Sequence, residues 1–363
     1  MGARIMKRTV STASALGVSL ALAFAGTITA APWAPAAAAL PNLPGGTTSA
    51  AADVNDAGQI VGWATTAGGA PHGVVWNDGE ISDLGLLDGD VAGYATAISD
   101  NGLIVGVSGE GPYDHSETSH AVLWRDGRII DLGLLPGGSY SAAADVNDAG
   151  QVVGCGRMAE RGGLSLVLRG FLWDDGVRTV LPPLQPESDL LSTLSCATSI
   201  NDRGVVAGNS AVYELQTDEL TWRTVTWEDG IPIDRGTVAG DPHSTASAIS
   251  QNGKIVGVSG DFYTGEDLVA YAAIWNGGNA RPLARPAGTI WSTATDINAR
   301  GVVVGQYGTD DEGYGCRWIG STVSALLPLP GDQYSGALSV NDHGLIVGWS
   351  ADASYGDHAV TWQ

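Results

Sequence analysis

A recurring column of aromatic and histidine residues carries the clearest binding chemistry in this sequence. The chain repeats a short turn that begins with Asn or Ser and closes with Gly, such as "NDAG" at 55–58. The position seven residues before each such turn holds, in chain order, Thr48, Ala92, Tyr140, Leu194, His243, Trp291 and Tyr334. Aromatic faces beside hydroxyl and acidic groups suit stacking on sugar rings, and they equally suit a protein interface. We predict ligand-binding residues at Tyr94, Tyr140, His243, Trp291 and Tyr334; the alternative is that they only fill space in the fold.

Residue patterns typical of catalysis do not occur in the sequence. There is no G-x-S-x-G nucleophile elbow and no H-E-x-x-H zinc motif. Three of the six histidines, His72, His120 and His358, share one repeat position, which argues for a structural role. With 39 acidic residues, a glycosidase-type carboxylate pair could arise by coincidence, and nothing selects one. We therefore expect a non-enzymatic protein with no catalytic residues and no cofactor.

The turn "DVNDAG" at 53–58 resembles part of a calcium-binding loop. Asp53, Asn55 and Gly58 have suitable spacing, but Ala57 stands where a side-chain oxygen is required. Calcium needs six to eight oxygen ligands. The expectation is a hairpin turn that holds no metal.

Three cysteines are too few for a disulfide scaffold. Cys155 ends one strand of its repeat, and Cys196 lies near the start of the next repeat. These positions come to similar heights if the repeats pack side by side. We expect that Cys155 and Cys196 could form a disulfide, which would leave Cys316 free.

Seven copies of a longer sequence motif indicate the fold that positions the candidate binding residues. Each copy resembles "VNDAGQIVG" (54–62), and the central glycines are separated by 44, 48, 54, 49, 48 and 43 residues. Repeats of this length that contain only short strands are typical of propeller blades. The sequence predicts an all-β, seven-bladed β-propeller with four-stranded antiparallel blades.

One repeat predicts four strands in order. A strand of small residues such as "SAAADV" (141–146) fits the crowded centre, and "QVVG" opens the second strand after a tight turn. A third strand ends in Trp, from Trp76 to Trp362, and a fourth resembles "IIDLGLL" (129–135). We expect the seven Trp side chains to pack between blades. Function should sit on the longer loops from second to third strand, for which we predict residues 108–119, 156–169, 209–222, 259–271 and 307–315.

The last repeat stops at "DHAVTWQ" and lacks its fourth strand. The segment "ALPNLPGG" (39–46) matches the end of a repeat and stands before the first small-residue strand. We therefore predict that the N-terminal segment completes the last blade, which removes the open sheet edges. The propeller is predicted to span residues 40–363, after an Ala/Pro-rich linker at 31–39.

Residues 1–30 have the order of a secretory signal peptide. A basic start at 4–8 precedes a short apolar run at 15–26, and "ITA" ends at Ala30. Removing this segment's three basic residues changes the formal charge from −22 to −25. Such a field repels nucleic acid and anionic membrane surfaces. We expect a secreted protein with no nucleic-acid partner and no membrane insertion.

The pairing of "NDxGxxVG" with "HAxxW" and "DLGxLPGG" resembles the bacterial extracellular HAF repeats, named for His-Ala-Phe. "HAV" occurs at His120 and His358, and "HGV" at His72. The resemblance covers residues 40–363 and implies a secreted β-propeller, without implying a shared reaction. Two readings remain open. The first is a lectin-like module that binds cell-wall or cell-surface glycans, alone or as the targeting subunit of a secreted assembly, and the second is a protein–protein scaffold; a glycan-active enzyme ranks third.

Overall fold

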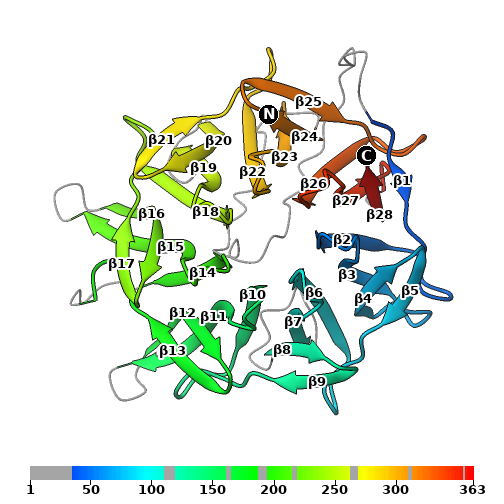
Figure 1. Ribbon diagram of the computed structural model, residues 1–363, viewed down its shortest axis with the longest axis horizontal. Helices are drawn as coiled ribbons and strands as arrows, with labels where there is room; N and C mark the ends of the chain where they lie inside the picture. The colour runs from blue at the N-terminus through cyan, green and yellow to red at the C-terminus, as the bar shows by residue number, and fades with distance from the viewer. Residues whose placement is uncertain are drawn as a thin grey trace, which may run out of the picture.

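The computed structural model is a closed ring of seven four-stranded antiparallel sheets, so the predicted seven-bladed β-propeller is confirmed (Figure 1). We number the blades 1 to 7 from β2 onward. The predicted signal peptide lies outside the described residues. The structure describes residues 35–109, 119–160, 165–186, 194–214, 219–261, 269–309, 313–354 and 356–363. Within these ranges no helix is long and apolar enough to cross a membrane.

The two inner strands of each blade hold the small-residue segment and the strand that follows the repeated turn. The innermost strands are β2 (Ser49–Val54), β6 (Ala92–Ile98), β10 (Ser141–Val146), β14 (Ser195–Ile200), β18 (His243–Ile249), β22 (Trp291–Ile297) and β26 (Tyr334–Val340). The second strands are β3 (Ile60–Thr65), β7 (Ile104–Gly109), β11 (Val152–Glu160), β15 (Val206–Glu214), β19 (Ile255–Asp261), β23 (Val303–Gly308) and β27 (Ile346–Ala351).

The two outer strands of each blade follow in the same order. The third strands are β4 (Pro71–Asn77), β8 (His120–Arg125), β12 (Ser165–Asp174), β16 (Glu219–Glu228), β20 (Val269–Asn276), β24 (Gly313–Ile319) and β28 (Asp357–Trp362). The outermost strands are β5 (Glu80–Asp83), β9 (Arg128–Asp131), β13 (Val177–Leu181), β17 (Ile231–Asp234), β21 (Asn279–Pro282), β25 (Thr322–Leu326) and, completing blade 7, β1 (Ala38–Ala39).

The ring closes as predicted, but its closing strand lies slightly earlier than expected. Ala38 and Ala39 pair with Thr361 and Val360, and the Leu40 amide donates to the Ala359 carbonyl at 2.8 Å. The closing strand therefore belongs to the segment predicted as linker, and the boundary at residue 40 cuts it off. Residues 40–46 correspond instead to the link that leads into the next blade.

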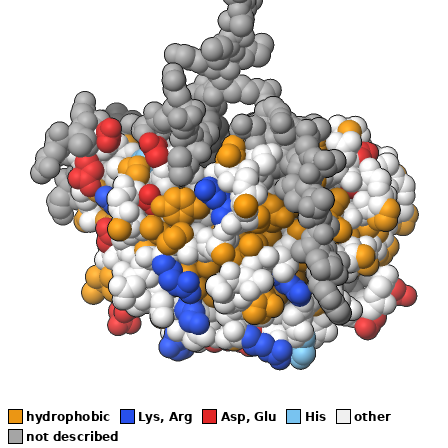
Figure 2. Space-filling view, turned by 90° about the horizontal axis from the view of Figure 1, so that it is seen from above, with side chains coloured by type: hydrophobic (Ala, Val, Ile, Leu, Met, Phe, Trp, Pro, Cys, Tyr) orange, Lys and Arg blue, Asp and Glu red, His pale blue; other side chains and the backbone are white. Residues whose placement is uncertain are grey.

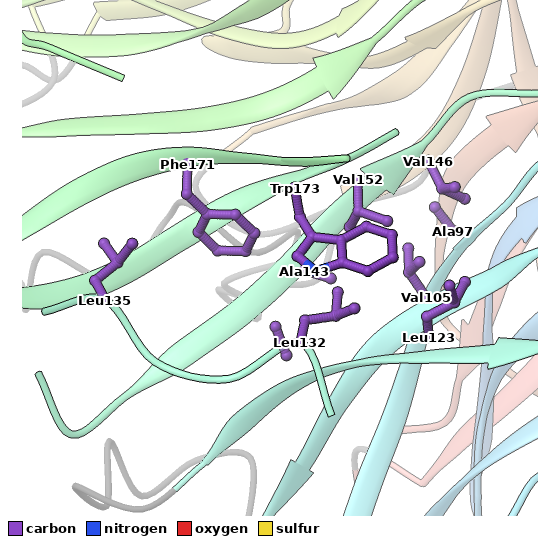
Figure 3. Close-up of a cluster of buried hydrophobic side chains, with 11 residues drawn as sticks. Ala97, Val105, Leu123, Leu132, Leu135, Ala143, Val146, Val152, Phe171 and Trp173 are labelled. Atoms are coloured by element: carbon purple, nitrogen blue, oxygen red, sulfur yellow. The ribbon is translucent and has the colours of Figure 1, made fainter. Parts of the chain in front are cut away.

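A separate hydrophobic cluster fills each of the seven boundaries between blades in the described structure. The boundary between blades 2 and 3 shows the pattern: Trp173 lies beside Leu132 and Ala143, with Phe171 two residues earlier on the same strand (Figure 3). All seven predicted Trp residues are at most 7% exposed. Six of these indoles also donate to a carbonyl of the link that enters their blade, as Trp76 does to Pro41 at 2.8 Å. The predicted packing role of the Trp residues is confirmed.

The repeated turn holds adjacent blades together at the end opposite the long loops. Gly58 closes the first turn with a φ of 81°, a conformation that favours glycine. Asn55 Nδ2 reaches across to the Ser99 carbonyl at 3.1 Å. Asn341 Nδ2 makes the same bond to the Asn55 carbonyl at 2.9 Å, between the last blade and the first. The repeat motif thus encodes a lateral clamp as well as a tight turn.

Three connections predicted as loops are largely strand. In blade 6, β23 and β24 pair as far as Gly308 and Gly313. In blade 4, pairing continues along β15 and β16 to Glu214 and Glu219, and in blade 3 along β11 and β12 to Glu160 and Ser165. The predicted loops at 156–169, 209–222 and 307–315 are therefore corrected to hairpins, while most of the predicted loops at 108–119 and 259–271 lies outside the described residues. In these hairpins the backbone stays extended because the two strands continue to hydrogen-bond to each other.

Candidate functional site

The predicted column lies at the start of the innermost strands in all seven blades. Its members are the first residue of the strand or the residue directly before it. In most blades a buried Ser follows, and in blade 7 the hydroxyl of Ser335 accepts from the Gly315 amide of blade 6 at 3.0 Å. Because successive residues of a strand point to opposite faces, Tyr334 points toward blade 1 instead.

Four aromatic residues form a continuous patch across blades 7, 1 and 2. We call Trp63, Tyr94, Tyr334 and Trp349 the aromatic patch. The rings of Trp63 and Tyr94 have centroids 5.8 Å apart at an interplanar angle of 55°. Trp349 and Tyr334 form a buried cluster with Ala50, and Trp63 packs against that cluster. Trp63 and Tyr94 are half-buried, whereas Tyr334 and Trp349 are 9% and 8% exposed, so Trp63 rests on two buried rings and contacts the half-buried ring of Tyr94 beside it.

Ring closure brings the two tryptophans of the patch together. Trp63 and Trp349 follow the same "IVG" in the first and last repeats, which the circle makes neighbours. Gly336 pairs with Trp349 across β26 and β27. A Cβ atom on Gly336 would lie 2.5 Å from the indole of Trp349, so glycine leaves room for the ring. Neither tryptophan was among the predicted ligand-binding residues; their shared repeat position was the available signal.

The structure does not add Tyr140, His243 or Trp291 to the aromatic patch. His243 is 1% exposed, and its Nδ1 accepts from the Trp222 amide at 3.3 Å. Burial keeps the pKa of His243 below its usual range. Since the imidazole is enclosed by protein, direct ligand contact by His243 does not fit this structure, although its place in the column was predicted correctly.

Tyr140 and Trp291 are half-buried at the same end of blades 3 and 6. Burial raises the pKa of Tyr140 to about 12, against the opposing charge of Arg157. The indole of Trp291 donates to the Thr309 carbonyl at 3.0 Å, which orients it along its own blade. Their predicted ligand contacts remain predictions.

Ser350, Asp332 and His358 combine the residue types of a nucleophilic triad. Asp332 Oδ2 accepts from the Ser350 hydroxyl at 2.6 Å and lies 3.3 Å from His358 Nδ1. In a triad the serine would instead be hydrogen-bonded to the histidine. Ser350 is fully buried, and its oxygen also accepts from the Leu329 amide. The arrangement therefore serves to hold strands and links together.

The repeat-position histidines are each paired with a carboxylate. His72 Nδ1 lies 2.7 Å from Asp83 Oδ2, and His120 Nδ1 lies 2.8 Å from Asp131 Oδ2. Each pair joins the start of a third strand to the end of the outermost strand. His358 turns to Asp332 because Ala39 stands where blades 1 and 2 have Asp83 and Asp131. These contacts support the structural role inferred from the repeat.

The turn that resembles a calcium loop uses its first carboxylate differently. Asp53 Oδ1 accepts from the Val54 amide at 2.8 Å and from the Ser339 hydroxyl at 2.6 Å. Its Oδ2 accepts from the Ile98 amide in blade 2 at 2.8 Å. Both carboxylate oxygens of Asp53 therefore accept hydrogen bonds from neighbouring blades, one from blade 7 and one from blade 2. In the described residues no group of three or more His, Cys, Asp or Glu side chains is arranged to hold a metal ion.

Cys155 and Cys196 form a disulfide between blades 3 and 4, with their Cα atoms 5.1 Å apart. Cys155 lies on β11, and Cys196 lies on β14, the innermost strand of the next blade. The bridge lies at the base of the long hairpins of these two blades. Cys316 is buried as a free thiol.

The negative charge of the chain is not spread evenly around the ring. One edge of the disc gathers Lys and Arg side chains between hydrophobic ones (Figure 2). The outermost strands of blades 3, 5 and 6, which are β13, β21 and β25, contain no carboxylate, whereas β5, β9 and β17 each end in Asp. The outermost strands therefore differ in negative charge from blade to blade, although the net charge of the chain is strongly negative.

No protein-family model matches this chain, and no curated protein matches its sequence. The solved structures it resembles include the β-propeller domain of the trilobed protease from Pyrococcus furiosus, with a TM-score of 0.53, 13% identity, and coverage of 87% of this chain and 96% of that one. That propeller has an open velcro topology, whereas β1 and β28 close the present ring. At this identity the likeness shows the fold alone.

Two whole peptidases have similar propellers. An acylaminoacyl peptidase from Pyrococcus horikoshii gives a TM-score of 0.51 at 11% identity, over 87% of this chain and 51% of that chain. A puromycin-hydrolyzing peptidase from Mycobacterium tuberculosis gives 0.51 at 14% identity, over 87% and 50%. This chain therefore spans about half the length of these two proteins.

Proposed function

We propose that this protein is a secreted, non-enzymatic binding module that recognises glycans of a cell wall or cell surface through the aromatic patch. The observation that carries the proposal is the contact between two half-buried rings, Trp63 and Tyr94, of which Trp63 packs against the buried rings of Tyr334 and Trp349. A ring held from behind by packed side chains loses little conformational freedom when a ligand stacks on it. Such a surface can bind the apolar face of a sugar.

Hydroxyl groups adjoin the patch on the side of the long loops. Thr65 lies two residues beyond Trp63 on β3 and so shares its face of the strand. Its hydroxyl lies 3.3 Å from that of Thr48, the column residue of blade 1. Stacking surfaces beside hydrogen-bonding groups are the usual composition of small-ligand sites. The sequence likeness to HAF repeats, which are extracellular, is consistent with a surface ligand.

A glycan array followed by calorimetric titration of any bound oligosaccharide tests the proposal. Trp63→Ala and Tyr94→Ala should each weaken binding by roughly two- to twelvefold, since stacking on an aromatic ring contributes about 0.5–1.5 kcal/mol. Trp291→Ala is the matched control, because it removes a half-buried indole outside the patch. Loss of binding in the Trp291 variant alone would instead support the originally predicted column.

A protein–protein scaffold is the second candidate, favoured by the long β11–β12 and β15–β16 hairpins. Hairpins of this kind offer extended edges and side chains to a partner. Absence of glycan binding, together with a stable protein partner lost on shortening these hairpins, would favour the scaffold. Hydrolysis of a bound glycan would favour an enzyme.

A further inference from the structure

One serine hydroxyl lies within hydrogen-bond distance of two carboxylates in the centre of the ring. Ser339 Oγ is 2.6 Å from Asp53 Oδ1 and 2.9 Å from Asp296 Oδ2. A hydroxyl has one hydrogen, and an ionised carboxylate can only accept. If both carboxylates were ionised, one of the two contacts would place two acceptors against each other. Both contacts are hydrogen bonds only when one carboxyl carries a proton and donates it to Ser339.

The three side chains connect the blades on both sides of the ring closure. Asp296 belongs to blade 6, Ser339 to blade 7 and Asp53 to blade 1. Asp296 Oδ2 also accepts from the Val340 amide at 2.9 Å, and Asp53 Oδ2 accepts from the Ile98 amide of blade 2. These backbone donors fix the orientation of both carboxylates, so that the contact through Ser339 is built into the fold.

No positive charge occupies the equivalent position on the other innermost strands. That position holds Ala97 on β6, Ser199 on β14 and Ala248 on β18, and β10 contributes a further carboxylate, Asp145. Toward the turns, Asp342 and Asp56 follow from β26 and β2, linked by a bond from the Asp342 amide to Asp56 Oδ1 at 2.8 Å. His343 Nδ1 is 3.7 Å from that same Asp56 oxygen.

The surroundings therefore favour a neutral carboxyl. Loss of water around the group is the main cause that raises the pKa of Asp296 to about 6, and the charge of Asp53 adds to it. Burial likewise raises the pKa of Asp53, against three hydrogen bonds that oppose the shift. Geometry and electrostatics agree that the pair retains a proton well above the pH at which an exposed Asp loses it.

We propose that Asp53, Ser339 and Asp296 form a proton-sharing clasp that fastens the ring closure in mildly acidic medium and weakens as the medium becomes alkaline. Below neutrality one carboxyl donates to Ser339 Oγ, and Ser339 donates to the other carboxylate. When that proton leaves for solvent, two negative charges face one hydroxyl across the junction of blades 6, 7 and 1. The carboxylates of Asp53 and Asp296 then repel each other, and the contact between blades loosens.

The sign of the pH effect follows from proton linkage. An unfolded Asp titrates near 3.8, and Asp296 titrates near 6 in the folded ring. Between these values the folded state binds more protons than the unfolded state, so stability falls as pH rises. The contribution is fully present below the unfolded pKa and is lost as pH passes through the folded pKa.

The test measures the melting temperature of the mature propeller from pH 4.5 to pH 8.5. Asp296→Asn and Asp53→Asn each supply a permanent amide donor to Ser339 and remove one titrating carboxyl. Each variant should take up about one proton fewer on folding near pH 5 than the natural chain. Each should also lose less melting temperature between pH 5 and pH 8 than the natural chain does.

Asp90→Asn is the control, because Asp90 also accepts from a serine, Ser108 at 2.6 Å, but shares that hydroxyl with no second carboxylate in the described structure. This variant changes the net charge equally and should keep the pH slope of the natural chain. The proposal is overturned if both clasp variants keep the natural slope, or if Asp90→Asn reduces it as much as they do. A natural chain that becomes more stable from pH 5 to pH 8 would also overturn it.

Discussion

Trp63 and Tyr94 meet across blades 1 and 2 at the same pair of repeat positions that Cys155 and Cys196 occupy across blades 3 and 4. Trp63 and Cys155 each follow the glycine that ends the repeated motif, on the second strand. On the innermost strand of the next blade, Tyr94 pairs with Val107 and Cys196 pairs with Asn209, and each of these partners follows the same motif glycine in its own blade. One lateral position thus holds an aromatic contact at one boundary and a covalent bond at another.

The disulfide should stabilise the ring mainly by restricting the unfolded chain. Its cysteines are 41 residues apart, and a loop of this size corresponds to about 3–4 kcal/mol in the chain-entropy model. The Cys155→Ala, Cys196→Ala double variant should therefore unfold at lower urea concentration. Reducing agent should destabilise the natural chain by a similar amount and leave the double variant unchanged. A double variant as stable as the oxidised natural chain would contradict this account.

The glycine that ends each "NDxGxxVG" copy should tolerate no side chain. A Cβ at any of these seven positions would lie 1.9–2.1 Å from a carbonyl oxygen of the innermost strand, and at Gly348 it would meet the Gly336 oxygen at 2.0 Å. Backbone cannot yield there without separating the two inner strands. Gly348→Ala should cost several kcal/mol, comparable to severe overpacking of a core, or prevent folding.

The matched control for this substitution is Gly68→Ala. Gly68 is exposed, and an added Cβ would meet only the Thr66 hydroxyl at 3.7 Å, an ordinary contact. Its unfolding free energy, measured by urea titration, should stay within about 0.5 kcal/mol of the natural chain. Equal effects at Gly68 and Gly348 would show that the close backbone approach is not what requires the glycine.

The repeat made much of the fold readable from sequence. The number of blades, the buried Trp of each third strand and the chain ends that meet all followed from copies of one pattern. The closing strand at Ala38–Ala39 was placed too late, because two alanines have neither alternation nor size to mark a strand. Backbone pairing with β28, which a local pattern does not encode, determines its place.

The candidate site was less readable, because it depends on contacts between repeats. The column register was correct, yet register alone does not say whether a side chain reaches solvent; His243 is enclosed while Tyr140 is half-buried. Trp63 and Trp349 lie 286 residues apart in the chain and become neighbours only through closure. The pattern within a single repeat therefore predicts the column positions, whereas the aromatic patch depends on contacts between the first, second and last repeats.

Removing the N-terminal link should destabilise the ring more than removing the short closing strand. Residues 40–46 include Leu43, which is 9% exposed in the core between blades 7 and 1, and Pro41, whose carbonyl accepts from Trp76 at 2.8 Å. Without them the buried indole loses its acceptor and the cluster loses a Leu. Deleting 40–46 should therefore lower the melting temperature clearly, with a cost of roughly 3–6 kcal/mol from cavity formation and an unsatisfied donor.

Deleting residues 35–39 instead removes β1, with its two paired residues and its edge protection, and keeps Pro41 and Leu43 in place. The melting temperature of this shorter variant should fall less, while the newly exposed edge of β28 should make it self-associate at high concentration, as open sheet edges do. Light scattering and calorimetry on both variants separate the two effects. If deletion of 40–46 leaves the melting temperature unchanged, the link does not fasten the circle, and the closure must depend on the turn contacts of Asn341 and Asp342 with blade 1.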